Sequence, residues 1–95
     1  MKVKTKKYDD FIWHDCEQAS FKDLKTLNLT SKIPDYFLED SIEIGHLPKY
    51  ERKGNYELII LRAYSNVKQT DIINISQISN KIAFIIYEKT LISIH

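Results

Sequence analysis

The side chains that could bind a metal ion or act as nucleophiles are few and lie far apart in the sequence. Three histidines, His14, His46 and His95, fall in different predicted elements, and Cys16 is the one cysteine of the chain. His14 precedes Asp15, but neighbouring residues of a strand point to opposite faces of a sheet. We therefore expect no shared ligand at His14 and Asp15, and a buried, inert thiol at Cys16.

Sequence motifs of enzymes are also missing. The chain has 95 residues and two glycines, too few for a glycine-rich phosphate loop. Neither a Gly-x-Ser-x-Gly motif nor a cysteine–histidine pairing can be recognised. We expect a protein that is not an enzyme, with no catalytic residue, no cofactor-binding residue and no resident cofactor.

A predicted helix over residues 34–42 has an acidic C-terminal end. Carboxylates at this end of a helix oppose its dipole, and three of them lie here: Glu39, Asp40 and Glu43. Either a metal ion or basic side chains would compensate their charge. We favour a solvent-exposed acidic edge that pairs with Lys49 or Arg52.

The overall composition excludes several classes of partner. With 14 basic and 13 acidic residues the formal net charge is +1, so no overall field attracts nucleic acid or anionic lipid. Six tyrosines leave a base-stacking platform open as an alternative, but ordinary packing of these rings is favoured. We find no secretory signal, and no apolar run of the ~20 residues that span a bilayer. One cysteine fits a reducing compartment, and the isolated chain is expected to be soluble.

The N-terminal segment predicts a β-hairpin. Apolar residues and lysines alternate over residues 1–8, Asp9-Asp10 interrupts the alternation, and a short aromatic segment follows over residues 11–15. Lysines spaced along a strand are typical of a sheet edge that is protected against pairing with another molecule. We prefer this interpretation to a basic binding site.

Two short helices are predicted next. Ser20 and Asp23 have the spacing of a capping box at the start of a helix over residues 21–27. The second helix, over residues 34–42, begins at Pro34, where the missing N–H costs no intrahelical hydrogen bond.

Strands and turns make up the next part of the chain. Gly45 is expected to end the second helix and Pro48 to keep the chain extended. The turn Lys53-Gly54-Asn55 predicts a hairpin with arms over residues 49–52 and 56–64.

The C-terminal part predicts further strands. One strand is expected over residues 73–78, a turn at Asn80-Lys81, a strand over residues 82–87, another turn at 88–90 and a last strand over 91–95.

These elements predict one α+β domain over residues 1–95. Its sheet is expected to be mixed and largely antiparallel, with about six to seven strands and two short helices inserted after the first hairpin. The segments 58–61 and 82–87 are apolar on both pleat faces and therefore need cover on both sides. Two short helices cover one face, and an uncovered face forfeits several kcal/mol, roughly 25 cal/mol for each Å² of apolar surface. We therefore expect a chain that either forms oligomers or is the first part of a longer protein, and we favour the second.

Several segments, in this order and spacing, resemble the soluble N-terminal domain of CorA-type magnesium and cobalt transporters. Residues 38–62 have the family's Leu-acid-acid helix end, its Pro-Lys pair and its hydrophobic strand. The other matching segments are the tryptophan strand Ile12-Trp13-His14-Asp15, the helix at 21–27, the proline-started helix at 34–40, His46-Leu47-Pro48-Lys49-Tyr50-Glu51-Arg52, and the closing strand Lys89-Thr90-Leu91-Ile92-Ser93-Ile94-His95.

The resemblance implies the N-terminal part of an α/β/α-type funnel domain on the cytoplasmic side of the inner membrane. Such transporters are homopentamers that carry divalent cations (Mg²⁺ or Co²⁺) through transmembrane helices with a Gly-Met-Asn motif, which this chain lacks. The implied role is structural and regulatory, without a pore in this chain. Membrane contact is expected only through segments outside it. Regulatory Mg²⁺ bound between neighbouring funnel domains favours the closed state.

The sequence departs from the family pattern at the regulatory metal site. Ser65-Asn66-Val67-Lys68 is neutral to basic where the family carries acidic residues, and Lys81-Ile82 replaces a frequent Glu-Gln pair. Asp71 is the nearby carboxylate, and we name it as the candidate metal ligand. Regulation by this site is expected to be altered or missing.

A second hypothesis comes from a different functional class. The chain would be a free-standing α+β interaction module that dimerises through its open sheet face. The reading frame beyond His95 separates the two hypotheses: a long helix and paired hydrophobic segments favour the transporter, and a stop codon favours the module.

Overall fold

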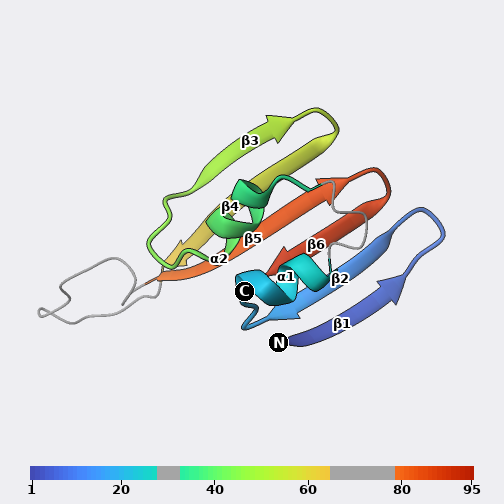
Figure 1. The fold of residues 1–95 in the computed structure, drawn as a ribbon, viewed down its shortest axis with the longest axis horizontal. Helices are drawn as coiled ribbons and strands as arrows, with labels where there is room; N and C mark the ends of the chain where they lie inside the picture. Colours follow the sequence, from blue (N-terminus) through green and yellow to red (C-terminus); the bar gives the residue numbers. More distant parts are fainter. Residues whose placement is uncertain (28–32, 65–78) are drawn as a thin grey trace, which may run out of the picture.

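The computed structural model describes residues 1–27, 33–64 and 79–95, within which six strands form one sheet (Figure 1). Two helices, α1 (Phe21–Leu27) and α2 (Asp35–Ile42), lie between the second and third strands along the chain. The strands are β1 (Lys2–Lys7), β2 (Ile12–Glu17), β3 (Lys49–Lys53), β4 (Tyr56–Tyr64), β5 (Ser79–Tyr87) and β6 (Thr90–Ile94). The predicted α+β fold, with both helices inserted after the first hairpin, is confirmed.

Across the sheet the strands follow the order β1-β2-β6-β5-β4-β3. Every neighbouring pair is antiparallel except β2 and β6, which run parallel with Cys16 opposite Ile94. The sheet is therefore mixed and largely antiparallel, as predicted. The parallel pair places the first hairpin beside the last strand of the chain (Figure 1).

The two predicted hairpins are formed by β1 with β2 and by β3 with β4. β1 is an edge strand, as its lysines predict, and all six of its residues are exposed. Gly54 has φ +60 in the two-residue turn between the paired residues Lys53 and Tyr56. A positive φ at the first central residue is what a tight hairpin turn of type II′ requires, and glycine adopts it without strain.

Both helices begin where the sequence predicts. The Asp23 N–H donates to the Ser20 hydroxyl over 3.1 Å, and the Ser20 N–H donates to the Asp23 carboxylate over 3.0 Å, so the capping box is formed. Pro34 is the N-cap residue of α2. Ile42 is the last residue of α2, as predicted, but the prediction that Gly45 ends the helix was wrong, because the extended Glu43 already ends it.

A second prediction was wrong at the start of β5. Asn80 and Lys81 do not form a turn but pair with Ala63 and Arg62 inside the β4–β5 ladder. Nine residues of each strand pair in register, and this long ladder outweighs the turn preference of one asparagine. The predicted loop at 65–70 and strand at 73–78 lie outside the described residues.

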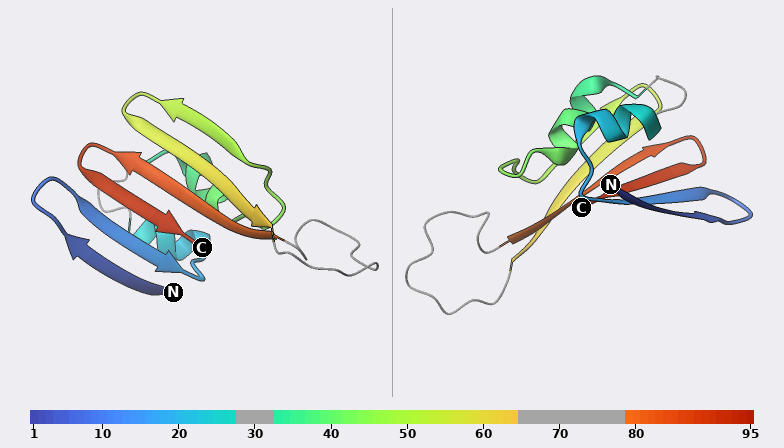
Figure 2. Two further views of the ribbon diagram at one scale, coloured as in Figure 1. Left: turned by 180° about the vertical axis from the view of Figure 1, so that it is seen from behind. Right: turned by 60° about the horizontal axis from the view of Figure 1, so that its bottom comes forward.

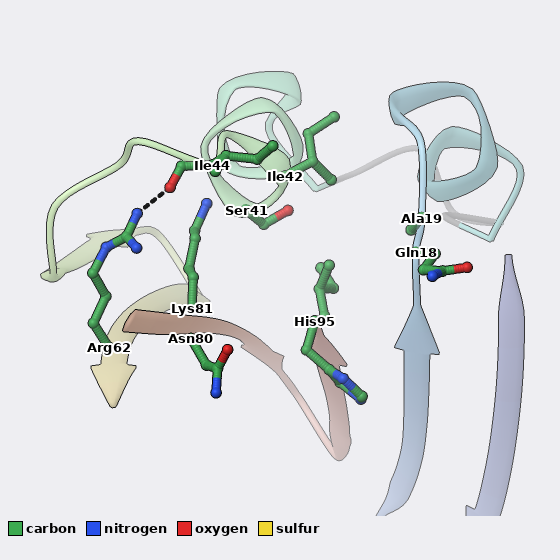
Figure 3. Close-up of a pocket in the computed structure, with 10 residues that line it drawn as sticks. Gln18, Ala19, Ser41, Ile42, Ile44, Arg62, Asn80, Lys81 and His95 are labelled. Carbon is green, nitrogen blue, oxygen red and sulfur yellow. Dashed lines mark hydrogen bonds between the residues drawn. The ribbon is translucent and has the colours of Figure 1, made fainter. Parts of the chain in front are cut away.

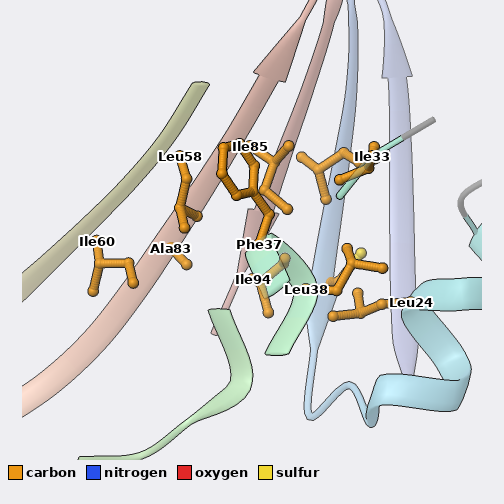
Figure 4. Packing of buried hydrophobic residues seen from close by; sticks show 11 residues of the cluster. Leu24, Ile33, Phe37, Leu38, Leu58, Ile60, Ala83, Ile85 and Ile94 are labelled. Atoms are coloured by element: carbon orange, nitrogen blue, oxygen red, sulfur yellow. The ribbon is translucent and has the colours of Figure 1, made fainter. Parts of the chain in front are cut away.

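Both helices cover the same face of the sheet (Figure 2). Leu24 of α1 and Phe37 and Leu38 of α2 are at most 2% exposed. They pack on buried side chains of β2, β4, β5 and β6 (Figure 4): Cys16, Leu58, Ile60, Ala83, Ile85, Ile92 and Ile94. The hydrophobic core is therefore on one side of the sheet, as the shortage of helices predicts.

Candidate functional site

The two faces of the sheet differ in what covers them. Side chains of alternate residues point to opposite faces, so Leu58 and Ile60 of β4 face the helices, whereas Ile59 and Leu61 face away. Leu61 is 50% exposed. The open face gathers apolar side chains from four strands: Trp13, Ile59, Leu61, Ile82, Phe84, Ile86 and Leu91. A contiguous apolar face is typical of a surface that packs against another protein segment.

Charged residues border the open face along β1 and β2. The register places three lysines of β1 opposite three residues of β2: Lys2 opposite Glu17, Lys4 opposite Asp15, and Lys6 opposite Trp13. The Lys6 Nζ atom lies 6.0 Å from the centre of the Trp13 ring, close enough for a weak cation–π interaction. The open face thus has an apolar centre and a charged border.

A chain of hydrogen bonds crosses this border between β2 and β6. The Trp13 indole N–H donates to Ser93 Oγ over 2.8 Å, and Ser93 Oγ donates to Asp15 Oδ1 over 2.5 Å. The His95 Nε2 atom lies 3.0 Å from the same carboxylate oxygen. The Ser93 hydrogen bond, followed by His95 and Lys4, lowers the pKa of Asp15 although burial opposes this shift. Asp15 is therefore held as a fixed carboxylate.

The same residue types occur in hydrolytic triads, but this arrangement is a different one. Ser93 is 1% exposed and donates to Asp15, not to His95. A nucleophilic serine must be accessible and must contact its general base. The geometry therefore does not activate Ser93 as a nucleophile.

A second charged cluster lies at the C-terminal end of α2. The Lys49 Nζ atom donates to Asp40 over 2.5 Å and to Glu51 over 2.9 Å, and His46 Nε2 lies 3.6 Å from Asp40. Burial acts to lower the pKa of Lys49, but the hydrogen bonds to Asp40 and Glu51 raise it. The predicted pairing of the acidic end with Lys49 is confirmed, whereas the Arg52 side chain donates to the Gly54 carbonyl.

Two further basic side chains cap the backbone at this end of α2. Lys81 Nζ donates to the carbonyl of Asp40 over 2.5 Å and to that of Glu43, and Arg62 donates to the carbonyls of Ile44 and His46. Burial, followed by the charge of Arg62, lowers the pKa of Lys81 to about 8. Free carbonyls at a helix end favour such cations.

These basic groups form one wall of a cavity of about 480 Å³ between the end of α2 and the β2–α1 connection (Figure 3). Ala19 and Ile42 supply part of the apolar lining. In Figure 3, Lys81 and Arg62 point toward the backbone around Ser41 and Ile44 and not into the centre of the space. The cavity therefore has the composition of a packing space and not of an anion site.

The structure separates His14 from Asp15, as predicted. His14 faces the helix side, where its Nδ1 atom lies 2.9 Å from the Thr5 hydroxyl, and burial lowers its pKa. Cys16 is fully buried, and burial raises the pKa of its thiol to about 11. Asp71, the predicted metal ligand, lies outside the described residues.

Sequence reasoning missed one group of side chains that the fold brings together. Asp15, Glu17 and His95 each place one ligand atom within 4.8 Å of the others. No local signal in the sequence could have found this group, because it depends on the parallel pairing of β2 with β6. A second group with the same residue types is formed by Asp40, Glu43 and His46.

None of the helices in the described part of the chain is long and apolar enough to cross a membrane.

A family model and two solved structures are similar to this chain. A family model described as CorA-like Mg²⁺ transporter protein matches residues 8–95. The fold is similar to the soluble domain of CorA from Methanocaldococcus jannaschii, with a TM-score of 0.66 and 23% sequence identity over 90% of this chain. The complete CorA magnesium transporter of the same organism gives a TM-score of 0.64, also at 23% identity over 90% of this chain. A search of curated proteins gives no match.

The chain spans 32% of that soluble domain and 25% of that complete transporter. The matched family is one of transporters and not of enzymes. The family match begins directly after β1 and extends through β6, so it covers both helices and the other five strands of the described sheet. The chain therefore belongs to the CorA-like Mg²⁺ transporter family.

Proposed function

We propose that this chain is the N-terminal cytosolic domain of a CorA-like transporter of divalent cations, Mg²⁺ or Co²⁺, and that it contributes to structure and gating without forming a pore. The family match over residues 8–95 supports this assignment. In the assembled transporter the domain lies on the cytoplasmic side of the inner membrane as part of a homopentamer.

The open face of the sheet carries this proposal. It presents apolar side chains of β2, β4, β5 and β6, and the similar soluble domain is about three times as long as this chain, which spans 32% of it. Each large apolar side chain that moves fully out of water contributes about 1.5–3 kcal/mol. A face of this composition therefore gains stability when the remaining parts of a longer protein cover it.

Metal-dependent regulation that is altered or missing relative to the family is a further part of the proposal. Asp71 is the proposed ligand of a regulatory Mg²⁺, in a segment with fewer carboxylates than the family pattern. Calorimetric titration of the chain with MgCl₂ tests this assignment, and we expect Asp71→Ala to weaken binding at least tenfold. Unchanged Mg²⁺ binding by this variant would remove Asp71 from the site.

The decisive experiment for transport is to determine the coding sequence beyond His95 and to express the protein that it encodes. We expect a long helix and two hydrophobic segments with a Gly-Met-Asn motif, and Mg²⁺ and Co²⁺ uptake when that protein is expressed in bacteria deficient in Mg²⁺ uptake. A stop codon, combined with a stable dimer in sedimentation equilibrium, would instead support a free-standing module.

A further inference from the structure

Asp15, Glu17 and His95 form a group of ligand-type side chains on the border of the open face. Asp15 and Glu17 are two residues apart on β2, so both side chains point to the same face. His95 directly follows β6, the parallel neighbour of β2. The three ligand atoms, two carboxylate oxygens and one imidazole nitrogen, lie within 4.8 Å of one another.

The backbone fixes the positions from which these side chains extend. The His95 N–H donates to the Cys16 carbonyl over 3.0 Å, and the Gln18 N–H donates to the His95 carbonyl over 2.9 Å. His95 is thus held on the residues between and beside the two carboxylates. The buried Ser93 hydroxyl orients Asp15 in turn. Hydrogen bonds that orient a carboxylate ligand are a usual part of metal sites.

The Glu17 carboxylate is available to a ligand. It is half-buried, yet it has no hydrogen-bond or ion-pair partner among the residues that the structure describes. Lys2 lies opposite Glu17 in the β1–β2 register, but their charged groups are not within ion-pair distance. A negative charge is therefore left available beside Asp15 and His95.

The group at the end of α2 has the same three residue types but different surroundings. The Lys49 ammonium lies 2.5 Å from Asp40, and the Lys81 ammonium donates to the carbonyls of Asp40 and Glu43. Two ammonium groups already compensate the negative charge of this cluster and would repel a metal cation. The β2–β6 group has no ammonium within ion-pair distance among the described residues, so the two groups are distinguished by their neighbours and not by their composition.

We propose that Asp15, Glu17 and His95 bind a divalent transition-metal ion such as Co²⁺, Ni²⁺ or Zn²⁺. Imidazole combined with carboxylates suits these ions, whereas Mg²⁺ prefers oxygen ligands alone. Three ligand atoms about 2.1 Å from one ion lie about 3.0–3.6 Å apart, so side-chain rotations that move the ligand atoms by up to about 1.5 Å close the site. Water completes the coordination. The site goes beyond the proposed transport function, because it would hold an ion on the domain without carrying it across a membrane and would favour transition-metal ions over Mg²⁺.

Titration of the untagged chain with CoCl₂ tests this inference. We expect one Co²⁺ per chain, a visible absorption spectrum of protein-bound Co²⁺, displacement by ZnCl₂ and no displacement by an equal concentration of MgCl₂. In NMR spectra the paramagnetic ion should broaden the imidazole signals of His95 and leave those of His14 and His46 sharp. Because the measurement needs neither a membrane nor transport, failure of this site and failure of the proposed function are distinguishable.

Matched variants assign the ligands. His95→Ala and the isosteric Glu17→Gln should each weaken Co²⁺ binding at least about tenfold. His46→Ala, which removes the imidazole of the α2 group, should leave Co²⁺ binding unchanged. Lys4→Gln removes a charge opposite Asp15 and should tighten binding about two- to fivefold. No Co²⁺ binding by the unmodified chain, or equal binding by folded His95→Ala and Glu17→Gln variants, would overturn the inference.

Discussion

The helix-covered face and the open face of this sheet are built from the same strands but differ in how far their apolar side chains are exposed to solvent. On β4, Leu58 and Ile60 are fully buried in the core on the helix-covered side, whereas their neighbour Leu61 is 50% exposed. Side chains of the chain itself cover this face and form the buried core, whose members lie between Cys16 and Ile94 in the sequence. The open face has equally apolar side chains without a cover. The difference indicates that stability comes from one face and that the other is available for association.

The comparison is tested most strongly by removing the same side chain from each face. Phe37 of α2 is fully buried in the core, and Phe84 of β5 lies on the open face. Phe37→Ala should lower the free energy of unfolding by about 3–5 kcal/mol because it leaves a cavity. Phe84→Ala should cost about 1 kcal/mol, as expected for a partly exposed site. Urea unfolding measures both, and equal costs would contradict the assignment of the core to one face.

A smaller effect is expected where α1 begins. Ser20→Ala removes the side-chain acceptor of the Asp23 N–H and should lower the free energy of unfolding by about 1 kcal/mol. The capping box also lowers the pKa of Asp23, mainly through the Ser20 N–H and then the Ser20 hydroxyl. Ser20→Asp, another good N-cap residue, should retain most of the stability. A Ser20→Ala variant as stable as the unmodified chain would show that α1 depends on packing alone.

The pH dependence of stability tests the buried groups of the covered face. Lys81 has a pKa of about 8 in the folded protein against 10.5 when exposed, so above pH 8 the unfolded chain binds more protons and stability rises with pH. Cys16 acts in the opposite direction, because its pKa rises from 9.0 to about 11 on folding. Stability lost through Cys16 above pH 9 therefore offsets the gain through Lys81.

We expect the free energy of unfolding to rise by at most about 1 kcal/mol between pH 8 and pH 9 and then to level off. Lys81→Met should remove the rise, and Cys16→Ala should extend it above pH 9. Urea unfolding at several pH values measures these slopes. A fall in stability between pH 8 and pH 9 in the unmodified chain would contradict the burial of Lys81.

The smallest effect on stability is expected on the open face. Leu61→Lys should change the free energy of unfolding by at most about 0.5 kcal/mol, yet it should weaken concentration-dependent self-association of the isolated chain. Leu47→Lys is the matched control, because Leu47 is 64% exposed but lies outside the sheet. Sedimentation velocity over a range of concentrations measures this self-association. Equal self-association of the two variants would argue against association through the open face.

Local signals made much of the fold predictable. The capping box of Ser20 and Asp23, Pro34 before α2 and Gly54 between β3 and β4 act within a few residues, so the helices and hairpins could be placed from sequence. The pairing of Lys49 with the acidic end of α2 also followed from charge and proximity in the sequence.

Long-range pairing could not be predicted in the same way. Asn80 has the preferences of a turn residue, but the length of its partner strand β4 decides its conformation. The carbonyl contacts of Lys81 at the end of α2 depend on how that helix lies on the sheet. His95 meets Asp15 only because β6 pairs with β2, a topological choice that neither segment encodes alone.

The central claim is that the open face is covered in a longer transporter protein. Leu61→Cys in a Cys16→Ala background places a single thiol on this face, and maleimide labelling can be timed in the isolated chain and in the protein extended beyond His95. We predict rapid labelling of the isolated chain and labelling at least tenfold slower in the extended protein. Equal rates in the two proteins would contradict the claim.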